Sequence, residues 1–227
     1  MDNRTDFRRG LNQAAERCQR IMREIDTTRK QLDENSIEEA YLNAFTLANE
    51  SEKLTLITRD LAYCFRHPNA LIDTEEMILE AVPVKIGYTH EGWFSVVFPS
   101  LLPKKEFGST EYIRGILSPA LRRFFFENAQ VYYPECVIIF RHVFHRGQPE
   151  RAYRDLDNFE VNMVTDIVAS FVMHDDSALR CFRFYCGVLG DSNRTEVYVV
   201  NKAEFEEWRE KEKHYPDCGP YLLENYP

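Results

Sequence analysis

The spacing of the apolar residues changes once along this chain, and that change constrains the fold more than any other feature. In the first 68 residues, apolar side chains recur in alternating steps of four and three. They are Phe7, Leu11, Ala14, Cys18, Ile21, Ile25 and Leu32, then Ala40, Ala44, Leu47, Leu54, Leu61 and Phe65. Steps averaging 3.5 residues are typical of a packed helical seam. Residues 1–68 are therefore predicted to form two helices.

The break between these helices is also marked in the sequence. The apolar pattern stops at residues 33–35, and Ser36 followed by Glu39 has the spacing of a capping box that starts a second helix. Pro68 ends that helix. Two helices of about 28 residues joined by a short polar turn are expected to fold back as an antiparallel hairpin. We interpret this hairpin as a docking or dimerisation arm.

From residue 82 onward the pattern is that of a mixed α+β domain. Strands are predicted at 82–88 and 93–98 as a hairpin, and further strands at 136–145, 179–188 and 195–200. Helices are predicted at 110–128 and 159–171. The expected order is ββ-α-β-α-ββ over residues 82–200, with a largely antiparallel or mixed sheet. Residues 201–227 are expected to form a short charged helix, 203–213, and an irregular tail.

The charge distribution permits contact with nucleic acid without requiring it. The chain of 227 residues has a net charge of −9, but residues 81–200 carry 13 Lys and Arg against 14 Asp and Glu. The chain opens without an apolar leader and contains no apolar stretch of membrane-spanning length. The six cysteines form no Cys-x-x-Cys pair, which favours reduced thiols. A cytoplasmic protein without a membrane segment is therefore expected.

One acidic motif carries most of the chemical signal. In Arg154-Asp155-Leu156-Asp157-Asn158, an extended backbone would direct both aspartates to one face. Asp and Asn are also common helix caps, so this motif alone can be explained by helix capping. Asp175 and Asp176 add further carboxylates before the next strand, and several carboxylates drawn together need a cation. Mg²⁺ accepts such oxygen ligands, with waters and substrate phosphate.

The segment Arg-Asp-Leu-Asp-Asn, a helix, and Asp-Asp resembles the signature of RusA-type Holliday-junction resolvases. The resemblance covers residues 82–200 and includes a strand that ends in a Pro-Ser loop, Phe98-Pro99-Ser100-Leu101. It implies that Asp155, Asp157 and Asp176 are catalytic and bind Mg²⁺ or Mn²⁺. It also implies a homodimer that cleaves branched DNA, and a homodimer suits a two-fold junction.

Two positions depart from that family. Its catalytic lysine corresponds here to Val161, and the asparagine of its Pro-Ser loop is missing, although Lys104 and Lys105 stand nearby. Losing the lysine removes a cation that would stabilise charge on the phosphate. The candidate DNA-contacting residues are Lys104, Lys105, Arg122, Arg123, Arg141, Arg146, Arg151 and Arg154. His142 and His145 are three apart on a predicted strand, so they face opposite ways and make a poor metal pair.

Geometry adds a condition to the acidic site. A helix of 13 residues is about 20 Å long, so Asp157 and Asp176 could not share an ion across a straight helix of that length. Either the helix is shorter or bent, or Asp176 meets the aspartate pair of another subunit. Two functional hypotheses follow. One is a RusA-like, structure-selective DNA endonuclease. The other is a non-catalytic RusA-like protein that binds DNA or protein, or forms oligomers, through its helical arm.

Overall fold

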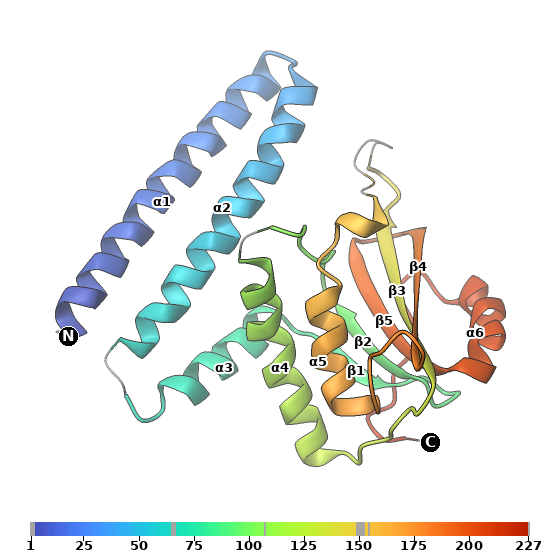
Figure 1. Ribbon diagram of the computed structural model, residues 1–227. Coiled ribbons are helices and arrows are strands. Elements are labelled where there is room, and N and C mark those ends of the chain that lie inside the picture. The colour runs from blue at the N-terminus through green and yellow to red at the C-terminus, as the bar shows by residue number, and fades with distance from the viewer. Residues whose placement is uncertain (1–2, 65–66, 107, 149–152, 154, 227) are drawn as a thin grey trace. The chain divides into compact units, whose positions relative to one another are not determined.

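The computed structural model contains two compact units, which are described separately. It describes residues 3–64, 67–106, 108–148, 153 and 155–226. The first unit comprises residues 1–77 and the second comprises residues 78–227. Within the described residues, the chain has six α-helices and a sheet of five strands, so the fold class is mixed α+β (Figure 1). No helix in this part of the chain is long and apolar enough to cross a membrane.

The first unit is dominated by a pair of long helices, α1 (Asn3–Asp33) and α2 (Ile37–Tyr63), which pack against each other. The helical pair predicted from the apolar spacing is therefore present. A third helix, α3 (Ala70–Ala81), follows and spans the boundary between the units. It lies in the stretch between the two predicted segments, where no element was assigned.

The contact between α1 and α2 differs from the predicted seam. Ala14 and Ala40 are buried, but Leu11 and Leu32 remain 46% and 53% exposed. Polar and small residues also contribute to the contact between the two helices. Arg17 donates to Glu50 at 2.5 Å, Asn43 donates to Gln31 at 2.8 Å, and Gly10 lies so close to Leu61 that a Cβ would be only 2.6 Å from its Cδ2. Part of the apolar stripe of α1 therefore faces away from α2.

The capping box at the start of α2 is only partly realised. Ser36 is the N-cap residue, but its side chain makes no capping hydrogen bond. The Glu39 carboxylate instead accepts a hydrogen bond from Gln31 Nε2 at 3.3 Å. The predicted start of the helix is correct, whereas the predicted hydrogen bonds that should stabilise it are wrong.

The second unit follows the predicted element order. Its strands are β1 (Lys85–Tyr88), β2 (Phe94–Phe98), β3 (Cys136–His145), β4 (Cys181–Gly190) and β5 (Arg194–Asn201). Its main helices are α4 (Ser109–Glu127), α5 (Asn162–Val172) and α6 (Phe205–Lys211). Short 3₁₀ turns lie at η2 (Leu156–Asn158), η3 (Lys202–Glu204) and η4 (Glu212–His214).

The sheet is mixed and has the strand order β1-β2-β5-β3-β4. All neighbouring pairs are antiparallel except β3 and β4, which run parallel with Cys136 opposite Cys181. Parallel neighbours require a crossover connection. Here the crossover consists of η2 and α5, so the acidic motif lies on the connection that leaves β3 and returns to the start of β4.

Each face of the sheet is covered by different helices (Figure 1). The larger core joins one face to α4 and α5, through residues such as Ile138, Leu117 and Val168. A smaller core joins the other face to α6, with Trp208 packed against Ile139 and Tyr198. The C-terminal tail also belongs to this unit, because Leu223 and Tyr88 exchange two backbone hydrogen bonds of 2.7 Å.

Candidate functional site

The two aspartates of the motif are at the surface beside η2. Asp155 is the N-cap residue of η2 and Asp157 lies within it, and both are exposed. The Asp155 side chain makes no capping hydrogen bond, and α5 is preceded by Val161 at its N-cap position. Helix capping therefore does not account for the carboxylate of Asp155.

The Pro-Ser loop runs alongside this motif. Lys104 is paired antiparallel with Phe159, Lys105 N donates to Asn158 O at 3.0 Å, and Glu160 N donates to Pro103 O at 2.9 Å. Both lysines are exposed. Two segments that are more than fifty residues apart in the sequence thus meet in one short backbone ladder, which contains Lys104 and Lys105 and directly follows Asp155 and Asp157. Of the predicted site residues, Lys104, Lys105, Asp155 and Asp157 are brought to one region.

A buried histidine lies beneath this ladder. The His142 ring stacks on Phe159 with ring centres 4.1 Å apart, and its Nδ1 lies 3.2 Å from Thr195 Oγ1. The Thr195 hydroxyl in turn accepts a hydrogen bond of 3.1 Å from Leu102 N of the Pro-Ser loop. Burial lowers the pKa of His142 to about 4, so the ring is neutral at pH 7. His142 therefore supports the ladder from inside the core, while His145 is exposed.

Asp176 lies at the other end of the crossover. It is exposed in the loop between α5 and β4, next to Asp175, whose carboxylate accepts a hydrogen bond of 3.3 Å from Ser177 N. The helix α5 has 11 residues and is about 16 Å long. Because β3 and β4 are parallel, the motif follows the carboxyl end of β3 and Asp176 precedes the amino end of β4. Among the described residues, no group of three or more His, Cys, Asp or Glu is placed to hold a metal ion.

The remaining basic candidates do not converge on one site. Arg122 and Arg123 are exposed on α4. Arg146 follows β3 and pairs with Asp217 at 2.6 Å. Arg151 and Arg154 lie outside the described residues. Arg141 was predicted to contact phosphate, but it is only 6% exposed and is bound within the protein, so that prediction is wrong.

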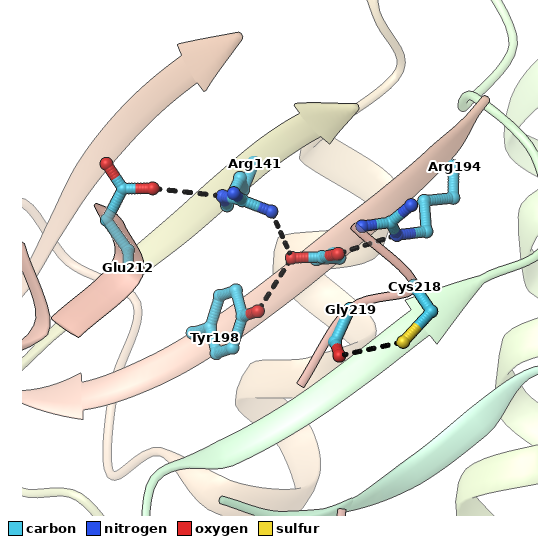
Figure 2. A network of polar contacts seen from close by, with 7 residues as sticks. Arg141, Arg194, Tyr198, Glu212, Cys218 and Gly219 are labelled. Carbon is cyan, nitrogen blue, oxygen red and sulfur yellow. Dashed lines mark hydrogen bonds and ion pairs between the residues drawn. The ribbon is translucent and has the colours of Figure 1, made fainter. Parts of the chain in front are cut away.

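The structure also shows a buried ionic network that was not predicted (Figure 2). Glu196 on β5 is fully buried and accepts hydrogen bonds from Arg141 Nη1 at 2.9 Å, Arg194 Nε at 2.7 Å and Tyr198 Oη at 2.7 Å. Arg141 also donates to Glu212 at 3.1 Å. Burial disfavours the charged guanidinium of Arg141, but the contacts with Glu196, Tyr198 and Glu212 together outweigh that effect, and the pKa of Arg141 is raised.

This network fastens the end of the chain to the sheet. Glu212 lies in η4 after α6, and Gly219 lies against the network, because a Cβ there would be 3.1 Å from Glu196 Oε1. Gly219 has a φ of 94°, a conformation that glycine adopts without strain. The charges of Arg141 and Arg194 balance those of Glu196 and Glu212. We therefore interpret the network as one that stabilises the fold. The alternation of Arg194 and Glu196 at the start of a strand that continues Val-Tyr-Val-Val was the only sequence signal for it.

The described part of the chain is thus a mixed α+β protein with an N-terminal helical pair and a crossover that carries an acidic motif. The chain belongs to a family of unknown function (DUF6100), whose model matches residues 2–225. That match covers both units. No curated protein matches the chain.

Proposed function

We propose that this protein is a RusA-like, metal-dependent endonuclease that hydrolyses phosphodiester bonds in branched DNA. The observation that carries the proposal is the ladder between the Pro-Ser loop and the acidic motif, where Lys104 pairs with Phe159 and Lys105 with Asn158. In support, the exposed Lys104 and Lys105 pair through their backbone with the segment that directly follows the exposed Asp155 and Asp157. A phosphate backbone and a divalent cation each find an oppositely charged partner in such an arrangement.

The residues at this edge suit Mg²⁺ or Mn²⁺. Mg²⁺ is commonly held by one or two carboxylates together with waters and substrate phosphate, and Asp155 and Asp157 are both exposed. Asp176 would serve as a third ligand from another subunit. When bound, the ion lowers the pKa of an attacking water and neutralises charge on the phosphate.

The chain's own residues would position the substrate. Lys104 and Lys105 would neutralise phosphate charge and set the register of the DNA on the ladder, and the exposed Arg122 and Arg123 on α4 would contact the DNA away from it. The position of the family's catalytic lysine is Val161, which is 2% exposed and packed in the core. Lys104 and Lys105 are thus the candidates for the missing charge stabilisation.

The test is cleavage of a labelled four-way junction in Mg²⁺ or Mn²⁺, beside a linear duplex of the same sequence. We expect Asp157→Asn to reduce cleavage by at least about a hundredfold, because it weakens binding of the metal ion that would stabilise charge in the transition state. Asp166→Asn is the matched control, because Asp166 is an exposed aspartate on α5 away from the motif. No cleavage by the wild type, together with no thermal shift on adding metal, would reject the proposal.

A second candidate function is a non-catalytic binding module that acts through the helical arm. It is favoured by the buried Val161 and by the apolar residues of α1 that α2 leaves uncovered, Leu11, Met22 and Leu32, which are 46%, 54% and 53% exposed. Apolar side chains repeated along one helix face are typical of a docking surface. Under this candidate, Met22→Lys with Leu32→Lys abolishes binding or self-association, and Asp157→Asn changes neither.

A further inference from the structure

Two cysteines lie directly opposite each other where β3 and β4 begin. Cys136 is the first residue of β3 and Cys181 is the first residue of β4, and the two are partners in the parallel register. Both are free thiols. Cys186, which is also on β4, has Arg141 as its partner in that register. The opposition of two thiols is thus specific to the first position of the two strands.

The geometry of this pair suits a disulfide bond. Neighbouring strands lie about 4.8 Å apart, and residues opposite each other direct their side chains to the same face of the sheet. Disulfides join residues whose Cα atoms are about 4.4–6.8 Å apart. Cys136 and Cys181 both belong to the larger core. Joining their sulfur atoms therefore requires rotation of the side chains and no change in the pairing of the strands.

The two thiols differ in acidity. A hydrogen bond between them lowers the pKa of Cys181, whereas the same hydrogen bond and burial raise the pKa of Cys136. In such a pair one sulfur becomes the thiolate while the other keeps its proton. The thiolate is the form of cysteine that attacks a disulfide. Cys181 is therefore the nucleophile of the pair, and Cys136 is the second thiol.

The pair is buried but lies next to exposed turns. Cys136 is 1% exposed and Cys181 is 4% exposed. Cys136 directly follows the exposed residues 134–135, and Cys181 directly follows an exposed loop, residues 174–180. A hydrogen bond of 2.9 Å from Cys181 N to Ser177 O attaches this loop to the strand. Strand ends beside exposed loops open locally without unfolding of the domain, and such an opening gives a small oxidant access to Cys181.

We propose that Cys136 and Cys181 form a reversible disulfide bond, which links the two ends of the crossover between β3 and β4. The oxidant is a low-molecular-weight disulfide such as oxidised glutathione. The Cys181 thiolate attacks one sulfur of this disulfide, forms a mixed disulfide and releases one small thiolate. The Cys136 sulfur then attacks the Cys181 sulfur and releases the second small thiolate. Two protein thiols are oxidised, one small disulfide is reduced, and the two protons of the protein thiols pass to the two released thiols.

The bond acts on the part of the chain that carries the acidic motif. The loop that it closes, residues 137–180, contains η2 and α5. Linking the ends of a loop stabilises the folded state mainly by restricting the unfolded chain, and the effect grows with loop length. The oxidised second unit is therefore more stable than the reduced one. This consequence does not depend on the proposed nuclease function.

The bond is tested by peptide mapping of the full-length wild type. The folded protein is incubated with oxidised glutathione, and the remaining thiols are then alkylated under denaturing conditions. Trypsin releases Cys136 in the peptide 124–141 and Cys181 in the peptide 181–183. We expect these two peptides to be joined, with a mass lower by two hydrogen atoms than that of the two reduced peptides together. Dithiothreitol should separate them again.

The same digest contains its own control. Cys18 and Cys218 are exposed, so glutathione adducts on them show that the oxidant is active. If these adducts form and the joined peptides do not, the proposal is overturned. Joined peptides that form only in urea-unfolded protein overturn it as well, because the pair must be set by the fold.

Two single substitutions test the order of the steps. Cys136→Ser leaves a hydroxyl beside Cys181 but no second thiol, so we expect glutathione to stay attached to Cys181. In Cys181→Ser we expect no adduct on Cys136. The reverse pattern overturns the assigned roles. Cys186→Ser is the matched control on the same strand and should still form the joined peptides. Tryptophan fluorescence checks that each variant is folded, and the mapping of the wild type does not depend on them.

Urea unfolding tests the consequence for stability. We expect the unfolding midpoint of the oxidised wild type to lie above that of the reduced wild type, and dithiothreitol to reverse the shift. Oxidised Cys136→Ser, which has the same adducts on its exposed cysteines, should show no increase over its reduced form. A midpoint that stays unchanged or falls when the wild type is fully joined overturns the stabilising role of the bond.

Discussion

The ionic network around Glu196 makes the sharpest prediction about stability. Replacing Glu196 by glutamine removes the negative charge while keeping the shape of the side chain. Arg141 and Arg194, which are 6% and 5% exposed, would then remain buried beside a neutral partner. Breaking a buried ion pair by removing one partner typically costs about 3–5 kcal/mol, because the remaining charge is left uncompensated. We therefore expect Glu196→Gln to lower the free energy of unfolding of the second unit by about 3 kcal/mol or more.

The assay is urea unfolding followed by tryptophan fluorescence. Trp93 and Trp208 are the only tryptophans of the chain, and both are buried in the second unit, so the signal reports this unit. The matched control is Glu206→Gln, which removes a pair with Arg209 at 3.2 Å in which the glutamate side chain is 77% exposed. That variant should change the free energy by less than about 0.5 kcal/mol. If both variants lose the same small amount, the network does not hold its charges in the way inferred from its burial.

Three further results are expected. The stability of the second unit should fall by about 2 kcal/mol between pH 7 and pH 5, because the pKa of His142 is about 4 in the folded state and about 6.5 in the unfolded state. Between these two pKa values the unfolded state binds more protons than the folded state. The contribution of the neutral His142 to stability is therefore complete above pH 6.5 and is lost toward pH 4. His142→Gln should reduce this pH dependence in urea titrations at pH 7 and pH 5. Gly219→Ala should destabilise the same unit by about 1–3 kcal/mol, since its φ is 94° and the added Cβ meets Glu196; an unchanged fluorescence midpoint would contradict this. In the arm, Glu50 is 7% exposed and pairs with Arg17, so Glu50→Gln should lower the melting temperature of the helical signal at 222 nm, whereas Glu34→Gln, which alters an exposed pair with Lys30, should leave it unchanged.

The spacing and type of neighbouring residues predicted individual helices and strands correctly. The strand at residues 136–145 was predicted with its observed bounds, because its run of β-branched and aromatic residues ends at a polar turn. The helical pair was also correct, but its predicted seam was only partly correct. The apolar stripe predicted on α1 includes Leu11 and Leu32, which α2 does not cover. Spacing reveals an apolar stripe, but it does not identify the partner of that stripe.

The residues of the candidate site were predicted from the sequence, whereas some of their tertiary contacts were not. The sequence marked Asp155, Asp157 and the Pro-Ser loop, and the structure brings their segments together through hydrogen bonds between Lys105 and Asn158 and between Glu160 and Pro103. The sequence did not predict that Arg141 is buried and paired with Glu196. That contact joins two strands whose register is set by long-range pairing.

The sequence by itself determined the helical pair, the order of strands and helices, and the residue types that suit a metal and phosphate site. These properties follow from periodicity and side-chain chemistry, which act over a few residues. Only the tertiary structure decided that β3 and β4 run parallel. That single pairing sends α5 back along the sheet and sets Asp157 and Asp176 at opposite ends of it. It also leaves β4 as an open edge. The direction of neighbouring strands depends on how distant segments bury their apolar faces together, and no local pattern encodes that choice.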